Sequence, residues 1–129
     1  KKKIRFWKSE SYKKTFFYKG WAPPHPSFFV KKKIYNKYGL YKTKIGNSSD
    51  FEFMYRVLEL KKVKSKYLDK ILVIMRYGGK SNNSLIQILS QNFEILKVLK
   101  IQRNLYLIIR FLVFKIINRT LQIINKNQT

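Results

Sequence analysis

The sequence of 129 residues lacks cysteine altogether and has only six acidic residues, five glycines, three prolines and one histidine. Without cysteine the chain can form neither a disulfide framework nor a thiolate metal site, which fits a reducing compartment. It also lacks the ~20 consecutive apolar residues of a membrane-spanning helix, because Arg110 and Lys115 interrupt its most apolar segment, 105–117. No apolar signal-peptide segment follows the lysines at positions 1–3. We therefore expect a cytoplasmic protein that does not cross a bilayer and, since no methionine opens the sequence, a fragment of a longer protein.

Basic residues dominate what is present, since 29 lysines and arginines give a formal net charge of +23 at pH 7. Such a charge suits a polyanionic partner, which could be nucleic acid, an anionic membrane surface or a phosphorylated substrate. Part of the excess reflects base composition, because lysine, asparagine, isoleucine, tyrosine and phenylalanine are the residues that an A/T-rich coding sequence produces. Hydrophobic residues make up 45% of the chain and aromatic residues 16%, which is enough for one core.

Three short segments are predicted to be strands. Apolar and basic residues alternate at 4–7, which is typical of a half-exposed strand. The three prolines should exclude a helix from 22 to 27 and keep the backbone extended into a strand at 28–30. The continuous, β-branched run at 71–75 predicts a buried strand.

Helical spacing predicts four helices. The first covers 31–38 and should end at Gly39, and the second begins near Ser49. A long amphipathic helix begins at Ser84, and another covers 105–124. The second helix should end in the basic run 61–66 after burying a stripe of Phe51, Met54, Val57 and Leu58. Together the predicted strands and helices indicate one mixed α/β unit.

Two residues are candidates for acid–base chemistry. Asp50 opens the second helix after a polar loop, where its carboxylate could accept a proton, although the helix dipole alone also favours an acid there. Ser49 and Glu52 have the spacing of a capping box, which would account for Glu52 fully. His25 is held between two prolines, where it could be an acid, a base, a hydrogen-bond donor or a metal ligand, or have no role. The residues alone leave these alternatives open.

A glycine pair follows the third predicted strand. The segment from Arg76 through Gly78 and Gly79 to Ser81 could surround a phosphate with a guanidinium, backbone N–H groups and a hydroxyl, and an ordinary turn explains it equally well. The interleaved aromatic and basic residues of 2–21 could instead stack nucleobases in a positive groove. The sequence contains no Asp-x-Asp.

Four longer motifs occur in a fixed order: Gly-Trp-Ala-Pro-Pro-His-Pro-Ser-Phe-Phe-Val at 20–30, Tyr-Gly-Leu at 38–40, Ser-Asp-Phe-Glu-Phe-Met at 49–54, and Met-Arg-Tyr-Gly-Gly-Lys-Ser-Asn at 75–82. As an ordered set they resemble the C-terminal half of a bacterial family 2 glycosyltransferase of the GT-A type. The resemblance implies an α/β acceptor-side portion of that fold at 1–104, followed by an amphipathic helix and tail at 105–129. In that fold a nucleotide-binding half, absent from this sequence, carries an Asp-x-Asp that holds Mg²⁺ or Mn²⁺.

The resemblance also implies roles for single residues. Asp50 falls on the acid that deprotonates the acceptor hydroxyl before inversion at the anomeric carbon. The acceptor would be bound by Trp21, His25 and Glu52, with His25 donating to a sugar hydroxyl or a lipid-linked phosphate. The loop that closes over the donor diphosphate would carry Arg76, Gly78, Gly79 and Ser81. Two pairs depart from the family pattern, since Tyr41-Lys42 replaces an aromatic-Asp and Ser48-Ser49 replaces Ala-Ala.

We therefore expect a glycosyltransferase fragment that serves transfer of a sugar from a nucleotide-sugar donor to a glycan or lipid-linked acceptor in surface polysaccharide biosynthesis. The isolated chain should be inactive, because the donor-binding half is missing. The alternative is a small basic nucleic-acid-binding protein. The helix at 105–124 would either lie in an anionic membrane surface at the inner face of the cell membrane or dock on protein. Its apolar stripe comprises Leu105, Ile108, Ile109, Leu112, Ile116 and Ile123.

Overall fold

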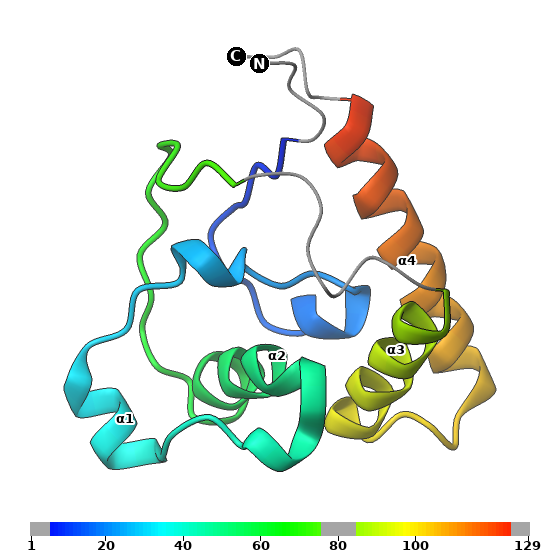
Figure 1. Ribbon diagram of the computed structural model, residues 1–129, viewed down its shortest axis with the longest axis horizontal. Coiled ribbons are helices and arrows are strands. Elements are labelled where there is room, and N and C mark those ends of the chain that lie inside the picture. The colour runs from blue at the N-terminus through cyan, green and yellow to red at the C-terminus, as the bar shows by residue number, and fades with distance from the viewer. Residues whose placement is uncertain (1–5, 76–84, 125–129) are drawn as a thin grey trace.

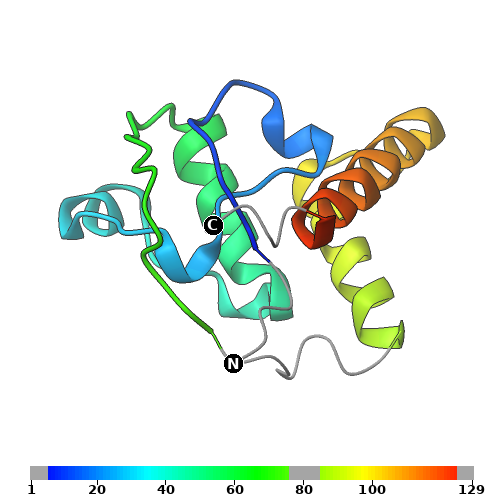
Figure 2. The ribbon, with the colours of Figure 1, turned by 90° about the horizontal axis from the view of Figure 1, so that it is seen from above.

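The computed structural model describes residues 6–75 and 85–124, and in these residues the protein is mostly helical (Figure 1). Helix α2 lies at the centre, α1 lies at one edge, and α3 and α4 lie together at the other (Figures 1 and 2). The α-helices are α1 (Lys32–Tyr38), α2 (Ser49–Tyr55), α3 (Leu85–Leu99) and α4 (Leu105–Ile124). Shorter turns between them are the 3₁₀ turns η1 (Phe16–Lys19), η2 (His25–Ser27) and η3 (Thr43–Ser48), and the π-helical turn η4 (Arg56–Leu60).

The described residues form no β-strand, so the predicted α/β class and the partial GT-A fold are wrong. A strand is stable only when a neighbouring strand pairs with its backbone N–H and C=O groups, and no described segment pairs in this way with 28–30 or 71–75. The run at 71–75 is exposed rather than buried, with Ile74 91% exposed. Of the segment 4–7, residues 4 and 5 lie outside the described residues, and the Phe6 N–H donates to the Gln122 carbonyl of α4 at 3.0 Å.

The helix predictions agree better with the structure. Helix α1 ends at Tyr38, and Gly39 follows it with a φ of 85°, a conformation that favours glycine. Helix α4 has the bounds expected from periodicity. The start of the third helix, predicted at Ser84, lies outside the described residues. Helix α2 begins at Ser49, its expected stripe is buried, and η4 ends just before the basic run.

The core is built around an aromatic cluster. Phe17 is fully buried, and its ring makes edge-on contacts with Trp21, Phe51 and Tyr55 at centroid distances of 5.7, 5.4 and 5.5 Å. Helix α4 closes this core with Phe111, which is also fully buried. The close approach of α4 to η1 requires glycine at position 20, because a Cβ there would lie 2.9 Å from the Cβ of Lys115.

Candidate functional site

His25 and Asp50 lie together on the surface. The His25 Nδ1 is 3.3 Å from Asp50 Oδ2, with the imidazole side chain 58% exposed and the carboxylate side chain 33% exposed. The predicted absence of a helix around the prolines is only partly right, since η2 forms a single 3₁₀ turn that carries the imidazole. Asp50 lies in the first turn of α2, where its Oδ1 accepts the Phe51 N–H at 2.7 Å. One carboxylate oxygen is therefore held by the backbone, while the other faces the imidazole.

Tyr41 lies near this pair, although the sequence prediction did not include it. Partial burial raises the pKa of its phenol to about 12, with further contributions from a hydrogen bond with Tyr35 and from the charges of Tyr35 and Asp50. The phenol is consequently protonated at neutral pH. The ring packs on Phe53 at 4.8 Å, and Tyr35 stacks on the same ring at 4.8 Å. The three rings pack against one another, and Tyr41 is the one that lies near Asp50.

Glu52 does not form the predicted capping box. Ser49 Oγ instead donates to the Lys42 and Gly46 carbonyls at 3.0 and 2.8 Å, and Glu52 is buried. Its carboxylate accepts from Arg56 Nε at 3.0 and 3.2 Å and lies 2.8 Å from Lys42 Nζ. Burial alone would raise the pKa of Glu52, but the hydrogen bonds from Arg56 and Lys42 hold it below its ordinary value. The carboxylate is therefore charged and enclosed by two cations.

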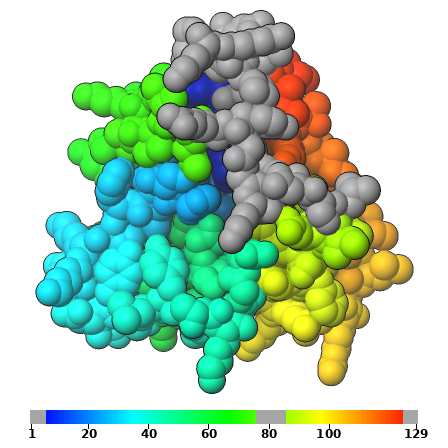
Figure 3. Space-filling view, in the orientation of Figure 1, coloured from blue at the N-terminus to red at the C-terminus, as the bar shows by residue number. Residues whose placement is uncertain are grey.

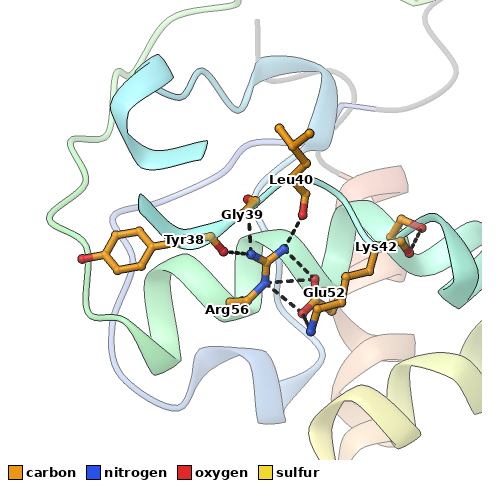
Figure 4. A network of polar contacts seen from close by, with 7 residues as sticks. Tyr38, Gly39, Leu40, Lys42, Glu52 and Arg56 are labelled. Carbon is orange, nitrogen blue, oxygen red and sulfur yellow. Dashed lines mark hydrogen bonds and ion pairs between the residues drawn. The ribbon is translucent and has the colours of Figure 1, made fainter. Parts of the chain in front are cut away.

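Arg56 extends this network to the backbone at the end of α1 (Figure 4). Its Nη1 donates to the carbonyls of Tyr38 and, at 3.3 Å, Gly39, while Nη2 donates to the Leu40 carbonyl at 2.7 Å. The guanidinium thereby fixes α1 and the loop that follows it to α2. Sequence reasoning missed this role because main-chain carbonyl acceptors have no residue signature.

Trp21 lies in a different place from the His25–Asp50 pair. Its ring contacts Phe16 and Phe17 at 5.3 and 5.7 Å, and it lines a cavity of about 260 Å³. Neither His25 nor Asp50 lines that cavity, whose walls include Trp7, Glu10, Asn118, Leu121 and Gln122. The predicted diphosphate loop, with Arg76, Gly78, Gly79 and Ser81, lies outside the described residues.

The described part of the chain holds no group of three or more histidine, aspartate or glutamate side chains that could bind a metal ion. His25 and Asp50 offer two ligands without a third. The divalent cation that the family resemblance implies would be held by an Asp-x-Asp, which is not in this sequence.

No known protein family, characterised protein or solved structure matches this chain. The resemblance to family 2 glycosyltransferases rests on the sequence motifs alone. The chemistry of the site must accordingly be argued from its own groups: a carboxylate with one anchored oxygen, an exposed imidazole and a protonated phenol. Such a set can orient a hydroxyl group and accept its proton.

Proposed function

We propose that this chain is the acceptor-binding part of an inverting sugar transferase, with Asp50 as the general base. The observation that supports this proposal is the contact of 3.3 Å between His25 and Asp50. The two residues come from separate motifs of the sequence, and the family resemblance assigns both motifs to one site. The helical fold differs from the GT-A expectation, so the proposal concerns the chemistry of the site and not that fold.

An acceptor hydroxyl is a poor nucleophile until a base takes its proton as it attacks. In the proposed step the hydroxyl oxygen bonds to the anomeric carbon of a nucleotide sugar, and the bond to the diphosphate breaks on the opposite side. The bonding electrons leave with the diphosphate, and the hydroxyl proton passes to Asp50 Oδ2. The imidazole of His25 holds that oxygen in place, and the Tyr41 phenol can donate to the acceptor sugar. The donor would be bound by another part of the enzyme, so we expect no turnover by this chain alone.

The first test is the coding DNA upstream of Lys1. An in-frame nucleotide-binding half with an Asp-x-Asp would support the proposal, and an upstream frame that encodes an unrelated domain would contradict it. In the longer polypeptide Asp50→Asn should lower kcat by ~10²–10⁴-fold, because the amide cannot accept the proton. Donor binding and stability should change little, since asparagine also suits a helix start.

Asp69→Asn is the matched control, because Asp69 is an exposed acid whose only described ion pair is with Lys8. Its turnover should equal that of the unmodified enzyme. Unchanged turnover in Asp50→Asn would refute the assignment of the base.

We also propose that the outward face of α4 lies on an anionic membrane surface. Among the described residues, no helix has both the length and the apolar character to cross a membrane. Helix α4 packs on the core through Phe111, with Leu107, Ile108 and Leu112 partly buried beside it. Its opposite face stays exposed and is mostly apolar, although Arg110, Arg119 and Thr120 are also exposed on α4. The exposed apolar side chains on α4 are Leu105, Tyr106, Ile109, Val113, Phe114, Ile116, Ile117, Leu121, Ile123 and Ile124.

The charge of the protein supports a lipid surface as the partner of this face. A formal net charge of +23 attracts anionic headgroups and repels a second copy of the chain. Figure 3 shows α4 along one edge of the molecule beside α3. Burial of apolar side chains at the acyl boundary and attraction of basic residues to headgroups would then act together.

Vesicle binding tests this location. The double variant Ile109→Gln, Ile116→Gln changes two exposed α4 residues, and Ile86→Gln, Leu89→Gln changes two exposed residues of α3 as a control. Binding to phosphatidylglycerol vesicles should fall in the α4 variant, persist in the control and weaken as salt rises, since the Debye length is ~10 Å at 0.1 M. Unchanged vesicle binding by the α4 variant would refute the proposal. If the protein self-associates in solution and only the α4 variant abolishes this, the exposed face of α4 is a protein interface instead.

A further inference from the structure

Four lysines surround one cavity between α1 and the segment that follows η4. The cavity has a volume of about 340 Å³ and is lined by residues of α1, the helix at one edge of the molecule in Figure 1. Lys33 and Lys37 come from α1, whereas Lys61 and Lys62 follow η4. The remaining lining residues are Ile34, Tyr38 and Val63, so no carboxylate lines the cavity.

The protein does not neutralise these lysines with its own acids. All six acidic residues lie within 6–75 and 85–124, and the ion pairs described there involve other basic residues. Asp69 pairs with Lys8, and Glu52 pairs with Lys42 and Arg56. Within the described part of the chain, the cavity is thus lined by four lysines that form no ion pair with a carboxylate. A bound anion would supply the negative charge that the protein itself does not place there.

Both walls of the cavity are fixed to η4, the turn that continues α2. Arg56 holds the end of α1 through the carbonyls of Tyr38, Gly39 and Leu40. On the other wall the N–H of Lys61 donates to the Arg56 carbonyl at 2.9 Å, and the N–H of Val63 donates to the Val57 carbonyl at 2.9 Å. The backbone on both sides of the cavity is therefore held by hydrogen bonds, and the four lysine side chains that line it are exposed.

Lys62 occupies a backbone conformation that usually favours glycine. Its φ is 51°, in the left-handed region, where a side chain is disfavoured. Glycine would adopt this conformation with less strain, whereas lysine adds a charged side chain to the lining of the cavity. Lys100, which does not line the cavity, has a similar φ of 58°, so this conformation marks a helix end and makes Lys62 replaceable by glycine.

We propose that this cavity binds a phosphate group carrying at least two negative charges, such as a diphosphate or a phosphomonoester. Several phosphate oxygens can each accept from a separate ammonium group, which suits four lysines approaching from two walls. The phosphate could belong to a soluble compound or to a lipid headgroup. The proposal is independent of the transferase chemistry, because neither His25 nor Asp50 lines the cavity.

The backbone provides a matched pair of variants. Lys62→Gly removes one cavity charge at a position where glycine fits the backbone without strain. Lys100→Gly removes one charge at the end of α3, where Lys100 has a similar φ of 58° and the following N–H, of Ile101, bonds back to the Leu96 carbonyl. Both variants lower the net charge equally, and both should retain the unfolding midpoint of the unmodified protein. Lys33→Gln, on the opposite wall, is a second cavity variant.

Isothermal titration of the full 129-residue chain with inorganic pyrophosphate is the first measurement. A charge-assisted hydrogen bond lost from the site should weaken binding ~10-fold in Lys62→Gly and in Lys33→Gln, against less than ~2-fold in Lys100→Gly. Equal weakening in all three variants would overturn the proposal, because only total charge would then matter. If the protein does not bind pyrophosphate, it must instead bind vesicles containing phosphatidic acid, and Lys62→Gly but not Lys100→Gly must weaken that binding. Failure of both kinds of binding would also overturn the proposal.

The pyrophosphate titration and the vesicle measurement distinguish a soluble phosphate compound from a lipid headgroup. Sensitivity of pyrophosphate binding alone to Lys62→Gly indicates a soluble ligand, and sensitivity of phosphatidic acid vesicles indicates a headgroup. Phosphatidylcholine vesicles are the uncharged control. A single-stranded oligonucleotide tests the nucleic-acid alternative. If it binds both glycine variants equally well and pyrophosphate cannot displace it, the basic residues serve nucleic-acid binding, and the cavity is refuted as a phosphate site.

Discussion

Replacing Arg56 with methionine should destabilise the protein strongly at neutral pH. The change keeps most of the aliphatic volume but removes the guanidinium that bonds to the Glu52 carboxylate and to the backbone of 38–40. The side chains of Glu52 and Arg56 are only 8% and 10% exposed, so the carboxylate would remain buried with Lys42 as its sole cation. Removing one partner of a buried ion pair costs ~3–5 kcal/mol. Lys42, whose side chain is 58% exposed, should keep the loss near the lower end of that range.

The loss should depend on pH in a defined direction. The folded-state pKa of Glu52 lies below its ordinary value, so the stability it contributes is complete above the unfolded pKa of about 4.3 and is lost as the pH falls through the folded pKa. Arg56→Met removes most of that depression. The difference in unfolding free energy between the two proteins should therefore shrink below about pH 4.

Urea unfolding followed by tryptophan fluorescence, at neutral pH and at stepwise lower pH, measures this effect. Arg110→Met is the control, because Arg110 is an exposed arginine of α4, and it should change stability by less than ~0.5 kcal/mol. A loss of less than ~1 kcal/mol for Arg56→Met, or a loss that does not change with pH, would refute the argument that a buried charged pair fastens α1 to α2.

Three further predictions concern the core and its edge. Phe17→Ala should lower the unfolding free energy by ~3–5 kcal/mol in chemical denaturation, and a much smaller loss would contradict its central place in the aromatic cluster. Lys115→Met should stabilise the protein by ~1–2 kcal/mol at pH 7, because burial and then Arg119 lower the pKa of Lys115 to about 8, and the lost hydrogen bond to Asn92 offsets only part of this gain. The gain should vanish by about pH 10.5, and a gain that persists there would contradict this cause. Glu59→Gln should cost ~1–2 kcal/mol and speed hydrogen exchange of the Thr15 amide, since Glu59 accepts from that N–H at 3.0 Å and from Tyr12 at 2.6 Å; unchanged exchange would show that other contacts hold the loop.

The sequence specified the helices better than it specified the rest of the fold. Apolar spacing was sufficient for 105–124, because the period of a helix is a local property. The run at 71–75 has strand propensity, but propensity does not supply a second strand, and the described residues offer none. A β-branched run without a partner stays exposed.

The site divides in the same way. The approach of His25 to Asp50 could not be deduced from spacing, and only the family resemblance placed them together before the structure did. Tyr41 departs from the family motif, and it packs against Phe53 near Asp50, a contact that no local pattern shows. The spacing of Ser49 and Glu52 predicts a capping box. In the structure the Glu52 carboxylate bonds to Arg56, which lies four residues later and is buried beside it, so the carboxylate does not cap the helix.

The position of Phe111 has a consequence for how the protein is made. This buried ring lies on α4, and that helix packs on η1, near the other end of the chain. A ribosome adds ~5–20 residues per second, so the aromatic residues of η1 emerge several seconds before the helix that covers them. During that interval the nascent chain presents an uncovered aromatic surface to chaperones, and a translation product interrupted before Phe111 would present it permanently. Quality control in the cell should accordingly distinguish such products from the finished chain by this surface.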